Sequence, residues 1–309
     1  MNRVGPKISA LHVPIKPRPH TIRISSQPHP ITNNNEIEIL TPSQIDRLAR
    51  LVAGKGWEAF DLLAHPELQT IDAIAKMLQG LPSNEIDLSL DLLDEYIIIK
   101  DYSTPARTLM IKLRDLAEEK PILVTPVVDY KAERTKSGHS LHYEMSTFTG
   151  LLTKTSIKFR DDPMTSFCQN HAGIHVSVDD YIGTGNQFLT MIEDIIKGGK
   201  KNTISHIATI CIQESAKIAL EAIGYIVISI NVLGKGLERL SVRRGVPQVD
   251  IFREYEALEK RTACAAEYRR GRDQSEALVT MKATPNNTLP IFWIEGKAKW
   301  PAPFPRPRR

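Results

Sequence analysis

Residues 178–187 read Val178-Asp179-Asp180-Tyr181-Ile182-Gly183-Thr184-Gly185-Asn186-Gln187. The run 175–178 just before the two acids is typical of a short strand. The run 184–197 has apolar residues at helical spacing. We therefore expect a strand that ends at the acids and a helix over 184–197. In an open parallel sheet, ligands bind at the carboxyl ends of the strands, so this stretch is a candidate site.

The residue types in this stretch suit a sugar phosphate. Two adjacent carboxylates, Asp179 and Asp180, can accept hydrogen bonds from vicinal hydroxyls or hold a metal through water. Glycines let backbone N–H groups turn toward a phosphate, and a helix N-terminus favours negative charge. The alternative without a ligand is an ordinary strand-to-helix turn with acidic capping residues. The candidate phosphate-binding residues are Gly183, Thr184, Gly185, Asn186 and Gln187.

Two other phosphate-binding patterns are excluded. The sequence contains no GxxxxGK[ST] loop, and the third glycine of a GxGxxG fingerprint is missing after Gly185. Three cysteines without a CxxC pair argue against a zinc ribbon or a disulfide framework and suit a cytoplasmic protein. No intrinsic metal site is predicted, because His171 and His175 beside the two acids do not follow a known ligand spacing.

Further strands and helices alternate around the candidate site. Strands are expected at 122–128, 206–212 and 225–230, and helices at 139–148 and 213–223. A strand–helix–strand alternation of this kind argues for an α/β fold with a parallel sheet and right-handed crossovers.

The two ends of the chain have a different character. Prolines suggest an extended arm at 1–40, and helical spacing suggests a helical module at 41–120 that begins with the capping pattern of Thr41 and Gln44. The predicted α/β domain, 121–309, ends in a helical and strand extension, with a strand near Phe292 and Trp293. The other expected helices are 57–64, 71–79, 86–97, 104–119 and 248–267.

Net charge is unevenly distributed along the chain. The whole chain carries +4, whereas residues 235–309 contain 16 Lys and Arg against 9 Asp and Glu. This basic C-terminal third could contact nucleic acid, although solvated helix faces explain it equally simply. The most apolar window, 222–233, is shorter than the roughly 20 residues that a membrane helix needs, so no membrane contact is expected.

The stretch 178–187 resembles the diphosphate-sugar signature of type I phosphoribosyltransferases: an apolar strand, two acids, two apolar residues and a Thr-Gly loop. The resemblance implies that Asp179 and Asp180 face the ribose 2′- and 3′-hydroxyls and that 183–187 hold the 5-phosphate. The implied ligand is phosphoribosyl diphosphate or a nucleotide, with Mg²⁺ held near the two acids together with the ligand. Gln187 departs from the signature, where the family commonly carries Thr or Ser.

The loop 129–138 follows the first expected strand of the core, where this fold family has its pyrophosphate loop. Its candidate residues are Lys136, which supplies positive charge, and Ser137 and Gly138, which supply N–H groups at a helix start. A solvent-exposed loop without a ligand is the alternative.

A narrower resemblance covers most of the chain. It rests on the helical lead with Trp57, the loop at 135–138, the central signature and the ending 286–293. These features resemble the phosphoribosyltransferase-like proteins predicted to act in bacterial conflict systems. The resemblance implies an anti-phage effector, with other proteins of a defence system as partners, that transfers or pyrophosphorolyses at ribose C1. The alternatives are a non-catalytic nucleotide or phosphoribosyl-diphosphate sensor and an interaction scaffold.

Overall fold

The computed structural model describes residues 40–57, 69–117, 120–130, 137–151, 156–166, 173–295 and 300–306. The chain divides into two compact units, Met1–Glu36 and Ile37–Arg309, and every described residue belongs to the second. Apart from Leu40, the predicted arm lies outside the described residues, and so do residues 58–64 of an expected helix.

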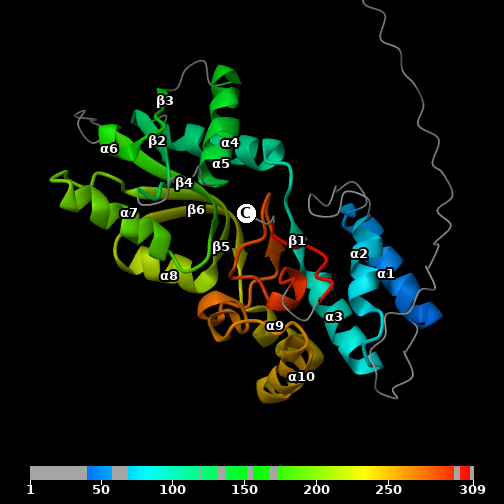
Figure 1. Cartoon of the computed structure of the whole chain (residues 1–309). Helices are drawn as coiled ribbons and strands as arrows, with labels where there is room; N and C mark the ends of the chain where they lie inside the picture. Colours follow the sequence, from blue (N-terminus) through cyan, green and yellow to red (C-terminus); the bar gives the residue numbers. More distant parts are fainter. Residues whose placement is uncertain are drawn as a thin grey trace, which may run out of the picture. The chain divides into compact units, whose positions relative to one another are not determined.

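Five parallel strands form the central sheet, in the order β3-β2-β4-β5-β6 (Figure 1). The parallel α/β fold that the sequence predicts is confirmed. The chain goes from β2 to β3 on one side and then to β4 on the other, so the direction of winding reverses between β2 and β4. The strands are β2 Ile122–Pro126, β3 Ile157–Phe159, β4 Ile174–Ile182, β5 His206–Gln213 and β6 Ile226–Leu233.

Strand β4 is longer than the expected 175–178. It has nine residues and pairs with β2 on one side and with β5 on the other, where Asp179 lies opposite Thr209 and Ile182 lies opposite Ile212. The two acids therefore lie inside the strand and not after it. Pairing with β5 extends the strand through residues whose polarity suggested its end.

Helices cover both faces of the sheet. Helices α4 (Ser103–Ala117) and α5 (Ser137–Thr147) share an apolar cluster with Val176, Val178 and Ala208 of the sheet. On the opposite face, α7 (Asn186–Lys197) and α8 (Glu214–Ala222) share a second cluster with Ile207 and Ile212. Because α5 follows β2 and α7 follows β4, the helices that leave these adjacent strands lie on opposite faces.

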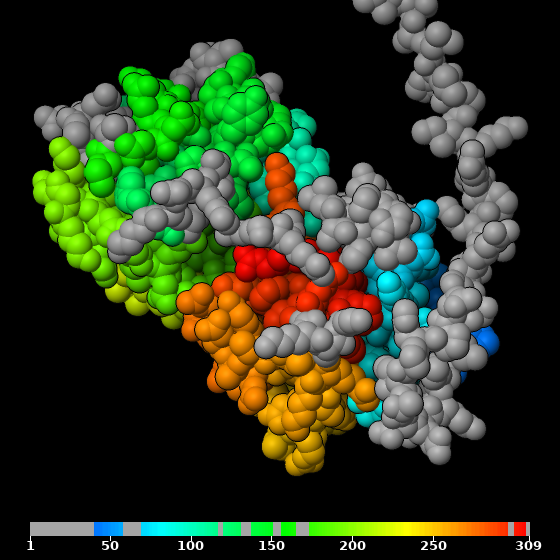
Figure 2. All heavy atoms as spheres, in the orientation of Figure 1, coloured from blue at the N-terminus to red at the C-terminus, as the bar shows by residue number. Residues whose placement is uncertain are grey.

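A separate apolar core joins the N-terminal helices to the C-terminal part of the chain, and we call it the composite core. It contains Trp57 together with Tyr255, Phe292, Trp300 and Phe304. Figure 2 shows the C-terminal residues, in orange and red, against the cyan N-terminal helices. Its helices are α1 Pro42–Gly54, α2 Thr70–Leu78, α3 Ser83–Glu95, α9 Gly236–Arg244 and α10 Gln248–Lys260.

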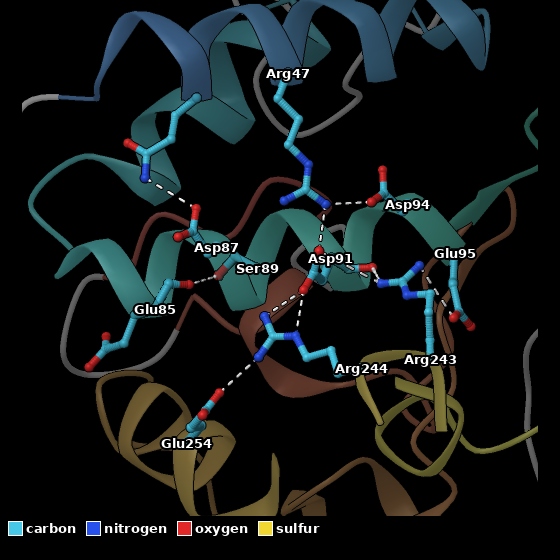
Figure 3. Close-up of polar contacts among 11 residues, drawn as sticks. Arg47, Glu85, Asp87, Ser89, Asp91, Asp94, Glu95, Arg243, Arg244 and Glu254 are labelled. Carbon is cyan, nitrogen blue, oxygen red and sulfur yellow. Dashed lines mark hydrogen bonds and ion pairs between the residues drawn. The ribbon is translucent and has the colours of Figure 1, made fainter. Parts of the chain in front are cut away.

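An ionic network on Asp91 of α3 links these helices (Figure 3). The Asp91 carboxylate accepts hydrogen bonds at 2.6 Å from Arg47 of α1 and from Arg244 of α9. Arg244 also donates to Glu254 of α10 at 3.0 Å, and Arg243 donates to the Asp91 carbonyl at 2.6 Å. Part of the positive charge of the C-terminal third is thus neutralised by acids of α3 and α10, in a partly exposed network between helices of the composite core.

Two short strands connect the composite core to the central sheet. Strand β1 (Ile97–Ile98) lies between α3 and α4, and it pairs in parallel with β7 (Val279–Thr280).

The predicted capping box at Thr41 and Gln44 is confirmed, and the first helix begins with it.

Two expectations for the C-terminal part are wrong. The helix expected at 248–267 ends at Lys260, and Ala263 then has a positive φ of 48° that no helix can contain. The strand expected near Phe292 is a single 3-10 turn that starts at Pro290, which lacks the N–H that a strand ladder needs. The Phe292 side chain itself is buried in the core. The remaining short elements are η2 Phe148–Leu151, α6 Pro163–Ser166, η3 Ala266–Tyr268 and η4 Arg272–Gln274. Within the described part of the chain, no helix has the length and apolar character to cross a bilayer.

Candidate functional site

The two acids lie near the carboxyl end of the central strand β4, where the winding of the sheet reverses. Their exposed fractions are 6% for Asp179 and 3% for Asp180. Asp179 accepts a hydrogen bond from the Asp180 backbone N–H at 2.9 Å, and Asp180 accepts one from the Tyr181 N–H at 3.0 Å. In doubly wound sheets the crevice at this reversal is the usual ligand site.

A cavity of about 750 Å³ opens at this point, within the 300–1,000 Å³ range of small-molecule sites. One wall is the whole predicted stretch 179–187, continued by Phe188 and Met191 of α7. The other wall comes from the C-terminal part of the chain: residues 283–287 together with Met281, Arg272, Asp273 and Arg306.

The loop between β4 and α7 has the geometry of an anion cradle. Helix α7 begins at Asn186, two residues later than expected, because Gly185 caps it with a left-handed φ of 80°. The Thr184 hydroxyl accepts a hydrogen bond from the Asn186 N–H at 3.3 Å. The first N–H groups of a helix lack partners within it, and this twelve-residue helix directs them toward the loop that lines the cavity.

Gly183 allows the C-terminal wall to touch this loop. A Cβ at residue 183 would lie only 2.3 Å from Oδ1 of Asn287. The Asn287 side chain is buried, and its Nδ2 donates to the Arg272 carbonyl at 3.3 Å. Sequence reasoning noted the segment 286–293 but assigned no contact to Asn287, because its partner lies about a hundred residues away in the chain.

The start of α5 approaches the acids from the other side of the crevice. A Cβ at Gly138 would lie 2.9 Å from Oδ1 of Asp179, and Ser137 lines the cavity. Lys136, the third candidate of this loop, lies outside the described residues. The structure therefore brings Ser137 to the same cavity as the stretch 179–187, and it places Gly138 against the Asp179 carboxylate.

Asp180 has a partner that sequence reasoning missed. The buried hydroxyl of Tyr102, just before α4, donates to Oδ2 of Asp180. Burial, and then the adjacent Asp180 charge, raise the pKa of Tyr102, so the phenol keeps its proton. Nothing in the sequence around Tyr102 signals this contact, since the residues are far apart in the chain.

Carboxylates outnumber cationic groups among the described residues that line the cavity. Five Asp side chains and two guanidinium groups contribute to its walls. A diphosphate ligand would need a divalent cation to offset this charge. The acids are Asp129, Asp179, Asp180, Asp194 and Asp273, and the cations are Arg272 and Arg306.

Neither His175 nor Cys211 contributes chemistry to the cavity. The His175 ring lies between the hydroxyls of Thr125 and Thr203, with both ring nitrogens at 3.0 Å from them, and His171 lies outside the described residues. Burial raises the pKa of the Cys211 thiol to about 12, as suits a core residue of β5. In the described ranges no three metal-binding side chains are grouped to hold an ion.

Fold and site together define an α/β protein with a parallel sheet, paired acids on its central strand and a glycine loop at the next helix. The chain belongs to the PRTase-CE family, the phosphoribosyltransferase-like proteins of conflict systems, whose family model matches residues 58–306. The resemblance seen in the sequence is therefore confirmed at the level of the family. No curated protein matches the chain.

Several solved phosphoribosyltransferase structures are similar to part of the chain. Orotate phosphoribosyltransferase from Aeropyrum pernix is 17% identical over 46% of this chain and 75% of its own, with a TM-score of 0.27. Orotate phosphoribosyltransferase from Mycobacterium tuberculosis H37Rv, in complex with 5-phospho-alpha-D-ribosyl 1-diphosphate, is 12% identical. The match covers 62% of this chain and 97% of that chain, with a TM-score of 0.28. Adenine phosphoribosyltransferase from Thermoanaerobacter pseudethanolicus is 10% identical over 41% and 80%, with a TM-score of 0.26.

Proposed function

We propose that the cavity binds a ribose 5-phosphate unit that carries a diphosphate or a base at C1. In this proposal 183–187 and the start of α7 hold the 5-phosphate, and Asp179 and Asp180 orient the 2′- and 3′-hydroxyls. The observation that carries it is the crevice between β2 and β4, where two buried acids, a left-handed Gly185 and a helix N-terminus face one cavity.

The donor set of the cavity suits Mg²⁺. The ion prefers carboxylate and phosphate oxygens and keeps several waters, and the acids of the cavity supply such oxygens. Asp179 and Asp180 would hold it through water, together with oxygens of the ligand. When bound, Mg²⁺ would neutralise charge on the diphosphate leaving group.

The chemistry that we propose takes place at ribose C1. The C1–O bond to diphosphate breaks and a bond from C1 to the acceptor forms, and pyrophosphorolysis of a nucleotide is the reverse. Asp179 and Asp180 hold the ring in place, and their charge stabilises the positive charge that develops on it. No side-chain nucleophile is needed. Membership of a conflict-system family supports an anti-phage effector role that alters a nucleotide pool, with other defence proteins as partners.

A sensor without turnover is the second candidate. The observation that favours a sensor is the origin of one cavity wall. This wall belongs to the C-terminal segment that also builds the composite core, so a ligand in the cavity contacts a part of the chain outside the sheet. A bound nucleotide could then alter a surface that a partner protein recognises. Release of pyrophosphate in the presence of phosphoribosyl diphosphate and mixed bases would support the enzyme, whereas binding without any release would support the sensor.

The binding proposal is tested by calorimetry with two ligands, each with and without Mg²⁺. Ribose 5-phosphate should bind with little dependence on Mg²⁺, because the helix N-terminus and the loop N–H groups hold its single phosphate. Phosphoribosyl diphosphate should need the ion, because its diphosphate faces an excess of carboxylates. Absence of binding by both ligands to the folded chain would contradict the proposal.

A further inference from the structure

Tyr102 connects three parts of the molecule at the candidate site. It lies between β1 and α4, and its exposed fraction is 1%. Its hydroxyl contacts Asp180 of the central strand and accepts a hydrogen bond from the Lys282 backbone N–H at 3.3 Å. The Lys282 ammonium also lies over the Tyr102 ring, 4.5 Å from the ring centroid.

The chemistry of the three groups fixes the direction of both hydrogen bonds. A backbone N–H can only donate, and an ionised carboxylate can only accept. The phenol of Tyr102 therefore receives a hydrogen from Lys282 and gives its own hydrogen to Asp180. Such an ordered chain holds the hydroxyl in one rotamer, directed at Oδ2 of Asp180.

Asp180 is constrained at both of its oxygens. Oδ1 accepts from the Tyr181 N–H, and Oδ2 accepts from Tyr102. Each oxygen has two lone pairs, so each can accept one further hydrogen bond from a ligand. Since the backbone contact is fixed by β4, the Tyr102 hydroxyl is the side-chain contact that sets how the carboxylate is rotated toward the cavity.

The first donor in this series of hydrogen bonds, the Lys282 N–H, belongs to the C-terminal wall of the cavity. Lys282 stands between Met281 and Ala283, which both line the cavity, and it lies two residues after Thr280, the last residue of β7. Backbone hydrogen bonds between β1 and β7 hold this segment, from Ile97 to Leu278 at 3.0 Å and from Ile99 to Thr280 at 2.8 Å.

We propose that Tyr102 is a positioning residue of the site, which fixes the Asp180 carboxylate for the ribose hydroxyl and takes its own position from Lys282 in the C-terminal wall. This inference rests on the proposed function. It assigns to the β1–β7 pair a role in ligand binding as well as in folding, because these strands fix the Lys282 N–H.

Tyr96 offers a matched control. Its exposed fraction is also 1%, and its hydroxyl contacts β7, at 2.7 Å from Oγ1 of Thr280 and 3.3 Å from the Val279 carbonyl. Loss of either hydroxyl removes a buried hydrogen bond and should reduce stability. Only Tyr102 contacts an acid of the site, so only its loss should reduce ligand affinity.

The experiment is calorimetry of the full chain with phosphoribosyl diphosphate and Mg²⁺, in the cold, where a modest loss of stability leaves the chain folded. Tyr102→Phe should weaken binding about tenfold, because an Asp180 carboxylate that can rotate makes a poorer hydrogen bond to the ligand. Tyr96→Phe should bind within about twofold of the wild type. Circular dichroism confirms that each variant is folded.

A double-mutant cycle tests whether Tyr102 acts through Asp180. In an Asp180→Ala background, Tyr102→Phe should cause no further loss of affinity. A wild-type affinity for Tyr102→Phe, an equal loss for Tyr96→Phe, or a full additional loss in the Asp180→Ala background would each overturn the inference. Absence of binding by the wild type would instead overturn the proposed function, and the positioning role with it.

Discussion

Gly183 and Gly185 stand two residues apart, and a side chain is excluded at each for a different reason. Gly185 has a left-handed backbone, whereas Gly183 leaves room for the Asn287 side chain. The first requirement comes from the local turn, so the sequence could suggest it. The second comes from a contact with a distant segment, which no local pattern contains.

Gly183→Ala tests the second requirement. The added Cβ would overlap Asn287 and separate the loop from the C-terminal wall, so we expect a loss of about 1–3 kcal/mol in the free energy of unfolding. Gly54→Ala is the control, since a Cβ there meets nothing within 4 Å and Gly54 ends helix α1. It should leave stability unchanged or raise it by up to about 1 kcal/mol. Urea unfolding measures both, and equal stability of the two variants would contradict the contact.

His142 predicts a pH dependence of stability. It is buried on α5, and its pKa is lowered chiefly by that burial. The unfolded chain therefore binds a proton more readily than the native state. The contribution of neutral His142 to the free energy of unfolding is complete above the ordinary pKa of histidine, about 6.5. It is lost as the pH falls below that value, because protons then favour the unfolded chain. His206 shifts in the same direction. Thermal melts from pH 7.5 to 5 should show falling stability, and His142→Gln should make the fall less steep.

At the scale of elements, the sequence predicted four of the five strands of the sheet and the helices that pack on it, but it missed β3 and several of the ends. Hydrophobic periodicity indicated β2, β4, β5 and β6, because buried strands of a parallel sheet are apolar runs. The end of β4 was missed because the ladder continues through the two acids to Ile182. The pairing of β1 with β7 was not predicted, since two short strands far apart in the sequence carry no local signal.

The network on Asp91 makes α3 the electrostatic centre of the composite core. Asp91→Ala would leave three guanidinium groups close together without their shared carboxylate, and we expect a loss of about 2 kcal/mol in unfolding free energy. The matched variant is Asp115→Ala, because Asp115 forms an ion pair with its exposed neighbour Arg114 alone within the described part of the chain. This variant should lose less than about 0.5 kcal/mol. Similar losses in chemical unfolding would argue against a cooperative network.

At the scale of the whole molecule, the two ends of the described chain build one core. Helices α1 to α3 pack with α9, α10 and the C-terminal aromatics, while α4 packs on the sheet. The division into an arm, a module at 41–120 and a domain at 121–309 stays a prediction. The composite core could not be foreseen from the sequence, because periodicity shows which face of a helix is apolar but not which segment covers it.

The composite core predicts that residues 1–120 and 121–309 depend on each other for folding. Expressed alone, fragments 1–120 and 121–309 would each expose half of the composite core, so we expect aggregation or broad, non-cooperative melting. Expressed together, they should co-purify and melt cooperatively. Independent cooperative folding of both fragments, without association, would show that the composite core is not required.

The central claim is that the cavity at the end of β4 binds a phosphoribosyl ligand through Asp179 and Asp180. The most direct measurement is calorimetry of phosphoribosyl diphosphate with Mg²⁺ on the wild type, on Asp179→Asn/Asp180→Asn and on the surface control Asp115→Asn. We predict saturable binding by the wild type and the control, with a loss of at least about a hundredfold in the double variant, as expected when two charge-assisted contacts are removed. Equal binding by all three proteins, or none by the folded wild type, would contradict the claim.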